Sequence, residues 1–192
     1  MTIALRERSE LLRHARASIE AGLRTGRMAA QPALASATLS ERRATFVTLK
    51  RGDELRGCCG SIEPRFTLAD DVWRNAWASA FADPRFSALE ASEYPEVHLH
   101  ISVLTPPQRL PLVDEADLLA ALRPGVDGLV LEMGASRATF LPVVWRTLPD
   151  PVDFVRHLKT KAGWPATFWS PEIRVWRYAT ESFGERGDEE SD

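Results

Sequence analysis

The chain has 192 residues, of which 44% are hydrophobic and 27% are charged, and its formal net charge is -3. A chain of this length buries about 70% of its unfolded surface, so it can fold without disulfides or a bound metal. The weak negative charge gives no general attraction to nucleic acid or to anionic lipid. Residues 1–12 interleave arginine with glutamate, unlike a secretory signal, and no uncharged apolar run approaches the roughly 18 residues of a membrane span. These features predict a soluble, cytoplasmic protein that makes no membrane contact.

The first half of the chain combines two helical patterns with a strand hairpin. Apolar residues recur at helical spacing over residues 6–23, which predicts an amphipathic helix. Residues 44–50 alternate, and a glycine-aspartate turn separates them from residues 55–60, which predicts a β-hairpin. Residues 67–81 begin with a threonine followed three positions later by an aspartate, a signal for the start of a helix. That helix is expected to end before the proline at position 84.

The second half holds shorter elements. The strict alternation of residues 97–104 predicts a strand with one apolar face and one mixed face. An aspartate followed by a proline at position 151 predicts the start of a helix. The other predicted elements are a short helix at 114–122, a second hairpin at 128–133 and 137–141, a short helix around 144–145, the helix at 151–162 and a last strand at 172–178.

The order of these elements indicates the fold class. Helices and hairpin-connected strands interleave without the regular alternation of a parallel α/β fold and without a glycine-rich phosphate loop. We therefore expect an α+β fold with mixed or antiparallel sheets and flanking helices. Residues 1–184 are expected to form a single domain, within which two small lobes would fit the two hairpins. Residues 185–192, which are charged and lack apolar anchors, are expected to form a disordered acidic tail.

Residues 55–60 read leucine-arginine-glycine-cysteine-cysteine-glycine and hold the two cysteines of the chain. Consecutive Cα atoms lie about 3.8 Å apart, closer than the roughly 4.4 Å at which ordinary disulfides begin, so reduced thiols are expected. Gly57 and Gly60 would let a ligand or another backbone approach this segment closely. The segment is the place in the sequence where reactive chemistry is plausible.

Seven segments, in order, resemble the AMMECR family, also known as protein A of the AmmeMemoRadiSam system. They are residues 46–49, 55–60, 83–86, 101–104, 127–129, 140–142 and 161–163, and the similarity runs from about Glu41 to Phe183. The resemblance implies an α+β fold of two unequal lobes, with the arginine-glycine-cysteine segment in or near the groove between them. It also implies association with a Memo-type protein and a radical S-adenosylmethionine protein. The family has no established reaction that the resemblance could carry over.

The chain departs from the family pattern at informative positions. Relatives mostly have an apolar residue at the position of Cys59, so the resemblance makes Cys58 the cysteine that carries the motif. Many relatives have histidine at the position of Asp127, and glutamate is common near His100. A cysteine-histidine pair carried over from such relatives would therefore lack its histidine here, and the resemblance identifies no general base.

Cys58 has two interpretations that the sequence leaves open. In an extended chain its side chain projects to the same face as that of Arg56, whose charge would favour a thiolate. Alternatively, Cys58 is a small buried apolar residue, as free cysteines commonly are. Arg56 would then pair with a carboxylate such as Glu63 or Asp83.

Metal and nucleic-acid binding are weaker alternatives. His98 and His100 share a strand face and, with a thiolate nearby, could ligate zinc or another transition metal. No CxxC or HExxH pattern accompanies them, so we predict no metal site and no cofactor. Arginines near the motif and six tryptophans suggest a nucleic-acid groove, but intervening acids cancel most of the charge, and Trp73 and Trp77 fall on a predicted core stripe. Nucleic acid is therefore not an expected partner.

Two functions remain open. The favoured one is a non-catalytic binding module or accessory component that holds a small anionic ligand or a partner segment at the motif. The alternative is a thiol-dependent enzyme acting on a nucleotide-like or cofactor-like substrate, with Cys58 as nucleophile or redox thiol, Arg56 stabilising an anion, and Asp127 or a histidine moving protons. The candidate binding residues are Arg56, Gly57, Gly60, Asn75, Arg85 and Asp127.

Overall fold

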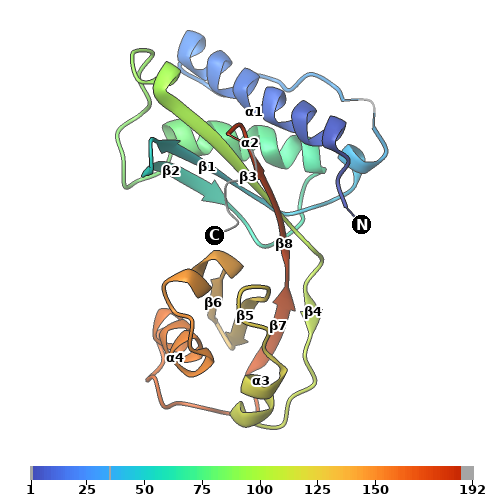
Figure 1. Cartoon of the computed structure of the whole chain (residues 1–192), viewed down its shortest axis with the longest axis vertical. Helices are drawn as coiled ribbons and strands as arrows, with labels where there is room; N and C mark the ends of the chain where they lie inside the picture. Colours follow the sequence, from blue (N-terminus) through green and yellow to red (C-terminus); the bar gives the residue numbers. More distant parts are fainter. Residues whose placement is uncertain (1, 35, 187–192) are drawn as a thin grey trace. The chain divides into compact units, whose positions relative to one another are not determined.

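The chain divides into two compact units. The computed structural model describes residues 2–34 and 36–186. The first unit holds Leu104 and the described residues before it together with those from Glu181 onward, and the second unit holds Thr105–Thr180. Within the described ranges, four α-helices and two four-stranded sheets confirm the predicted α+β class (Figure 1). The groove expected between two lobes stays a prediction.

The first unit is built on a sheet with strand order β2-β1-β3-β8. Its elements are α1 (Leu5–Thr25), the 3-10 turn η1 (Thr38–Ser40), β1 (Thr45–Arg51), β2 (Glu54–Gly60), α2 (Leu68–Phe81), the 3-10 turn η2 (Tyr94–Glu96), β3 (Val97–Leu104) and β8 (Thr180–Gly184). Alternate side chains of β1 and β3 pack with both α-helices in one core. Both helices therefore cover the same face of the sheet, while the side chains on its other face are half-buried and mostly polar.

Local signals set the helix boundaries as the sequence predicts. The Thr67 hydroxyl accepts a hydrogen bond from Asp70 N at 3.3 Å, which begins α2. The Asp150 carboxylate accepts from the backbone at Val152 and Asp153, which begins α4 (Pro151–Lys161). In the described part of the chain, no helix is long and apolar enough to cross a membrane.

The second unit has a sheet with strand order β4-β7-β5-β6. Its elements are β4 (Gln108–Arg109), α3 (Glu115–Ala121), β5 (Gly128–Met133), β6 (Ser136–Phe140), the 3-10 helix η3 (Pro142–Arg146), α4 and β7 (Arg174–Tyr178). Trp145 stacks on Phe154 with ring centroids 3.8 Å apart, in a core to which α3, α4 and the sheet all contribute. The predicted second hairpin is confirmed as β5 and β6.

The structure contains a strand at the C-terminal end that the sequence patterns do not predict. In β8 the apolar side chain that faces the core is Phe183, 3% exposed, and one apolar residue is too little for a recognisable alternation. Glu185, which was expected in the acidic tail, is also part of the fold. Its carboxylate accepts from Leu99 N at 2.9 Å and binds Arg16. Residues 187–192 of the expected tail lie outside the described residues.

Candidate functional site

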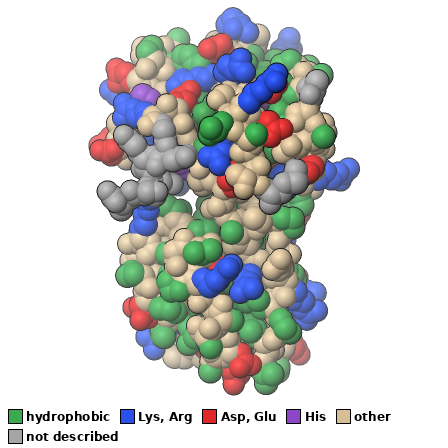
Figure 2. All heavy atoms as spheres, turned by 45° about the vertical axis from the view of Figure 1, so that its right-hand side comes forward, with side chains coloured by type: hydrophobic (Ala, Val, Ile, Leu, Met, Phe, Trp, Pro, Cys, Tyr) green, Lys and Arg blue, Asp and Glu red, His purple; other side chains and the backbone are tan. Residues whose placement is uncertain are grey.

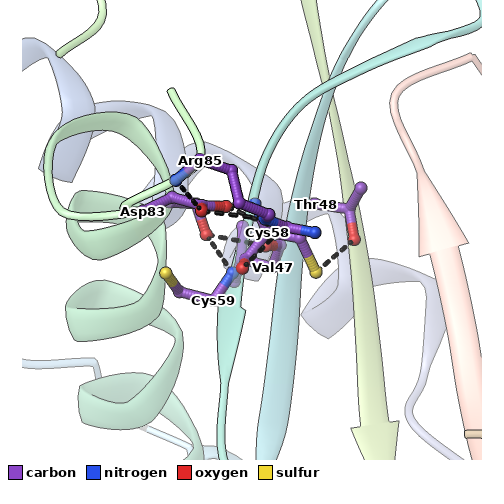
Figure 3. A network of polar contacts seen from close by, with 7 residues as sticks. Val47, Thr48, Cys58, Cys59, Asp83 and Arg85 are labelled. Carbon is purple, nitrogen blue, oxygen red and sulfur yellow. Dashed lines mark hydrogen bonds and ion pairs between the residues drawn. The ribbon is translucent and has the colours of Figure 1, made fainter. Parts of the chain in front are cut away.

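The two cysteines of β2 point to opposite faces of the first sheet. Cys59 pairs across the hairpin with Val47, whose side chain lies in the core, and Cys58 pairs with Thr48 on the other face. Figure 3 shows the Cys59 sulfur turned toward α2 and the Cys58 sulfur turned toward Thr48. Both thiols are free and half-buried. Although adjacent in sequence, the two thiols do not form one site.

The environment of Cys59 favours the neutral thiol. Burial raises the pKa of the Cys59 thiol, and the negative charge of the neighbouring Asp83 carboxylate raises it further. A thiolate is the nucleophilic and metal-binding form of cysteine. Cys59 is therefore held in its unreactive form, as a small side chain facing α2.

Helix α2 reaches into the β1-β2 hairpin through Ser79. The Ser79 hydroxyl accepts from Cys59 N at 2.8 Å and donates to Val47 O at 2.7 Å, so it takes the place of a direct strand-to-strand hydrogen bond between these two partners. Gly57 makes this close approach possible, because a Cβ at that position would collide with the Ser79 carbonyl oxygen. The missing side chain of Gly57 thus admits the backbone of α2 and not a ligand.

Asp83 and Arg85 close the outer edge of β2. Asp83 Oδ2 accepts from Cys58 N at 2.8 Å, and Arg85 Nη2 donates to Cys58 O at 3.3 Å (Figure 3). Arg85 and Asp83 also pair with each other at 2.7 Å, and this guanidinium holds the pKa of the Asp83 carboxyl well below its usual range. Both outward polar groups of Cys58 are satisfied, so the backbone that carries the thiol is fixed and the strand edge is blocked.

Arg56 lies at a β-bulge and forms an ion pair with Glu93. The register of the ladder shifts between Leu49 and Lys50, which leaves Arg56 without a partner on β1 and breaks the alternation expected from the sequence. Its guanidinium donates to both carboxylate oxygens of Glu93, at 2.8 and 2.9 Å, and not to either carboxylate expected from the sequence. Hydrogen bonding by Arg56 lowers the pKa of Glu93 to about 2. This ion pair connects β2 to the segment after α2, which carries Glu93.

Exchange of Glu93 for glutamine is expected to lower the free energy of unfolding by about 1–2 kcal/mol at pH 7, because it removes the charge from a two-bond ion pair. A carboxylate with a depressed folded pKa adds stability above its unfolded pKa of about 4.3. That stability is lost as the pH falls toward the folded pKa of about 2. Urea unfolding of the parent and of Glu93→Gln between pH 7 and pH 2 measures the difference, which should shrink below about pH 5. A difference that is constant across this range would contradict the assignment.

The space beside Gly60 is filled by the protein itself. Gly60 pairs with Phe46 across the hairpin. A Cβ at Gly60 would collide with the Phe46 ring and with the Thr45 carbonyl oxygen. The close approach predicted for both glycines of the motif therefore exists, but protein groups make it in each case.

The side chains that can carry chemistry meet on the face of the first sheet opposite α1 and α2, which we name the polar face. It carries Cys58, Thr48, His100, Ser102 and Ser182. Thr48 stands opposite both Cys58 on β2 and His100 on β3, and its hydroxyl donates to Cys58 Sγ at 3.4 Å. The Ser102 and Ser182 hydroxyls lie 2.9 Å apart. Nothing in the sequence singles out Thr48, because the signal that identifies it is its register opposite Cys58.

Two predicted site residues have structural roles elsewhere. Asn75 Nδ2 donates to Thr45 O at 3.1 Å and to the Asp71 carboxylate at 2.9 Å, and so ties α2 to the start of β1 on the core side of the sheet. Asp127 belongs to the second unit, where its fully buried carboxylate accepts from Arg123 N at 2.9 Å and from the Arg123 guanidinium. Neither side chain lies on the polar face.

The arginines around the motif are paired with carboxylates. The pairs are Arg51–Glu96, Arg56–Glu93, Arg65–Glu63, Arg74–Asp70 and Arg85–Asp83. Figure 2 likewise shows basic and acidic side chains interspersed over one side of the molecule. These arginines therefore lend no support to a nucleic-acid groove. Among the residues that the structure describes, no group of three or more His, Cys, Asp or Glu side chains is placed to hold a metal ion.

Comparison with known proteins decides the family. The AMMECR1 family model matches residues 12–183. The chain belongs to the AMMECR1 family. Similar members include a protein from Methanothermobacter thermautotrophicus, 37% identical over 181 residues that cover 92% of this chain and 93% of the relative. Protein MK0488 from Methanopyrus kandleri is 33% identical over 196 residues, covering 97% of this chain and 92% of its own.

A solved structure supports the fold of the family. The crystal structure of an uncharacterized protein, PH0010 from Pyrococcus horikoshii, matches with a TM-score of 0.84 and 32% sequence identity, and the match covers 94% of this chain and 92% of that one. These comparisons confirm the resemblance and the α+β class. They assign no reaction, so the function is argued from the site.

Proposed function

We propose that this protein is a thiol-dependent enzyme in which Cys58 is the nucleophile. One arrangement carries the proposal: Asp83 and Arg85 hold the backbone of Cys58, and Ser79 holds that of Cys59, while the Cys58 thiol stays half-buried on the polar face. A free cysteine that only filled space in the core would face α2, as Cys59 does. Fixing the backbone on three sides positions a reactive group, because misplacement by about 1 Å costs about a hundredfold in rate.

The polar face provides what a thiol nucleophile needs. The Thr48 hydroxyl donates a hydrogen bond to Cys58 Sγ, which orients the sulfur on this face. The substrate class that fits is a compound with an electrophilic carbon, such as an activated carbonyl. The sulfur forms a bond to that carbon, and the leaving group departs with the bonding electron pair. The thiol proton passes to a base of the protein.

Alkylation of Cys58 tests the proposal. With Cys59→Ser as the background, iodoacetamide at pH 7 is expected to react with Cys58 in the folded protein at least about tenfold faster than with the same thiol in the urea-unfolded chain. Mass spectrometry locates the adduct, and Cys58→Ser with Cys59 retained supplies the matched control for labelling elsewhere. A folded thiol that reacts no faster than the unfolded one would overturn the proposal.

A second candidate is a binding module, favoured by one nitrogen of Arg56. Arg56 Nη1 is buried and has no hydrogen-bond partner among the residues described, and such a donor costs about 1–3 kcal/mol when nothing accepts from it. An oxygen of a small anionic ligand or of a partner segment would satisfy it. Because Glu93 and Asp83 already neutralise Arg56 and Arg85, the charge available for an anion is small. The Memo-type and radical S-adenosylmethionine partners implied by the resemblance stay predictions under either role.

A further inference from the structure

We infer that His100 is the proton acceptor for Cys58 and that it acts through the hydroxyl of Thr48. The inference rests on the proposed role of Cys58 as a nucleophile and names the base that this role requires. The sequence alone leaves the choice of this base open between Asp127 and a histidine. Asp127 is fully buried in the second unit and bound by Arg123, whereas His100 is half-buried on the same face as the thiol.

The three side chains form one row across three strands. Thr48 on the central strand β1 is the register partner of Cys58 on β2 and of His100 on β3. Neighbouring strands lie about 4.8 Å apart, so the backbones at Cys58 and His100 are separated by about 10 Å. That is too far for a direct hydrogen bond. Thr48 stands between them, and a directly opposite pair brings Cβ atoms to about 5 Å.

The direction of the observed hydrogen bond fits a relay. The Thr48 hydroxyl donates to Cys58 Sγ at 3.4 Å, which leaves its oxygen lone pairs able to accept from an imidazole N–H of His100. This is the pattern that a thiolate and an imidazolium require. To reach it, the Cys58 proton moves to the Thr48 oxygen as the Thr48 proton moves to a ring nitrogen of His100. One S–H bond breaks, one N–H bond forms, and the hydroxyl is restored.

Charged side chains lie near both ends of the row. Lys50 and His98 are register partners further along the same face, on the strands that carry Thr48 and His100. At the edge of β2, Arg85 and Asp83 pair with each other, so their charges largely cancel. From β8, the face receives the neutral Ser182 hydroxyl.

The test compares four single variants on the Cys59→Ser background, each checked for folding by circular dichroism and thermal unfolding. His100→Gln and Thr48→Val are each expected to lower the rate of Cys58 alkylation by iodoacetamide at pH 7 by about tenfold or more. The loss should disappear near pH 10, where hydroxide removes the thiol proton without help from the protein. His98→Gln, the same exchange on the same strand face, should stay within about twofold of the parent. Thr48→Ser keeps the hydroxyl and should restore the rate.

The double variant and the parent separate the possible failures. Because both residues act along one path, His100→Gln combined with Thr48→Val should lose little more than either alone. A His100→Gln profile that equals the parent profile at every pH would overturn the inference and leave the nucleophile standing. A loss that His98→Gln shares equally would also overturn it, because it would reflect the general charge of the face. A parent thiol no faster than in the unfolded chain overturns the proposed function itself.

Discussion

Replacement of Gly57 by alanine is expected to destabilise the first unit by about 3 kcal/mol or more. The added Cβ would collide with the carbonyl oxygen of Ser79, and both groups belong to backbone that cannot rotate away. Relief requires β2 and α2 to separate, which also stretches the bonds of the Ser79 hydroxyl to Cys59 N and Val47 O. Urea unfolding followed by tryptophan fluorescence measures the loss.

Gly52→Ala is the matched control for this exchange. Gly52 has a φ of 60° and no atom within 4 Å of an added Cβ, so its cost is conformational and amounts to about 1–2 kcal/mol. Gly57→Ala should cost clearly more, and it should also change the alkylation rate of Cys58, which the strand carries. Equal costs at the two positions would show that α2 does not approach β2 as closely as described.

Replacement of Glu115 by alanine is expected to destabilise the second unit by about 3–5 kcal/mol, because it leaves a buried ammonium without its partner. Lys159 on α4 is 1% exposed, and its Nζ donates to Glu115 Oε1 on α3 at 2.8 Å. Glu115 itself is 27% exposed. Water can therefore hydrate the Glu115 carboxylate when the lysine is lost, whereas it cannot reach the Lys159 ammonium when the glutamate is lost. Thermal and urea unfolding measure the effect.

The two partners of this pair differ in burial, so exchanges of one partner serve as controls for exchanges of the other. Lys159→Met removes the buried charge and keeps most of the side-chain volume, so it should cost less than Glu115→Ala. The double variant Lys159→Met with Glu115→Gln should come close to the parent in stability, since neither charge remains. If Lys159→Met proved the more damaging exchange, the pair would not depend on burial of the lysine.

The motif shows how far sequence patterns reach into the site. The family motif identified Cys58 as the candidate cysteine. The alternation of side chains along a strand correctly places Cys58 and Cys59 on opposite faces of the sheet. The same alternation would place Arg56 beside the Cys58 thiol, but a bulge shifts the register of the hairpin at that point, and the Arg56 guanidinium binds Glu93. A bulge depends on how two strands pair, and no residue of β2 alone announces it.

The partners of the motif are distant in sequence, which is why they could not be named in advance. Arg56 binds Glu93, 37 residues further along, and Cys59 N binds Ser79, 20 residues further along. Each of these partners is one of several carboxylates or hydroxyls that the sequence offers. Only the packing of α2 and of the segment after it against the edge of β2 selects among them.

The sequence by itself determined the α+β class, the helices with their capping residues, the two hairpins and the family. These features depend on periodicity and on contacts within a turn or two, which neighbouring residues encode. Tertiary structure alone decided that the two glycines admit protein groups, that both arginines of the site are paired with carboxylates, and that Thr48 and His100 share a row with Cys58. Such contacts arise when strands and helices distant in sequence pack together, so their physical basis is the register and approach of whole elements.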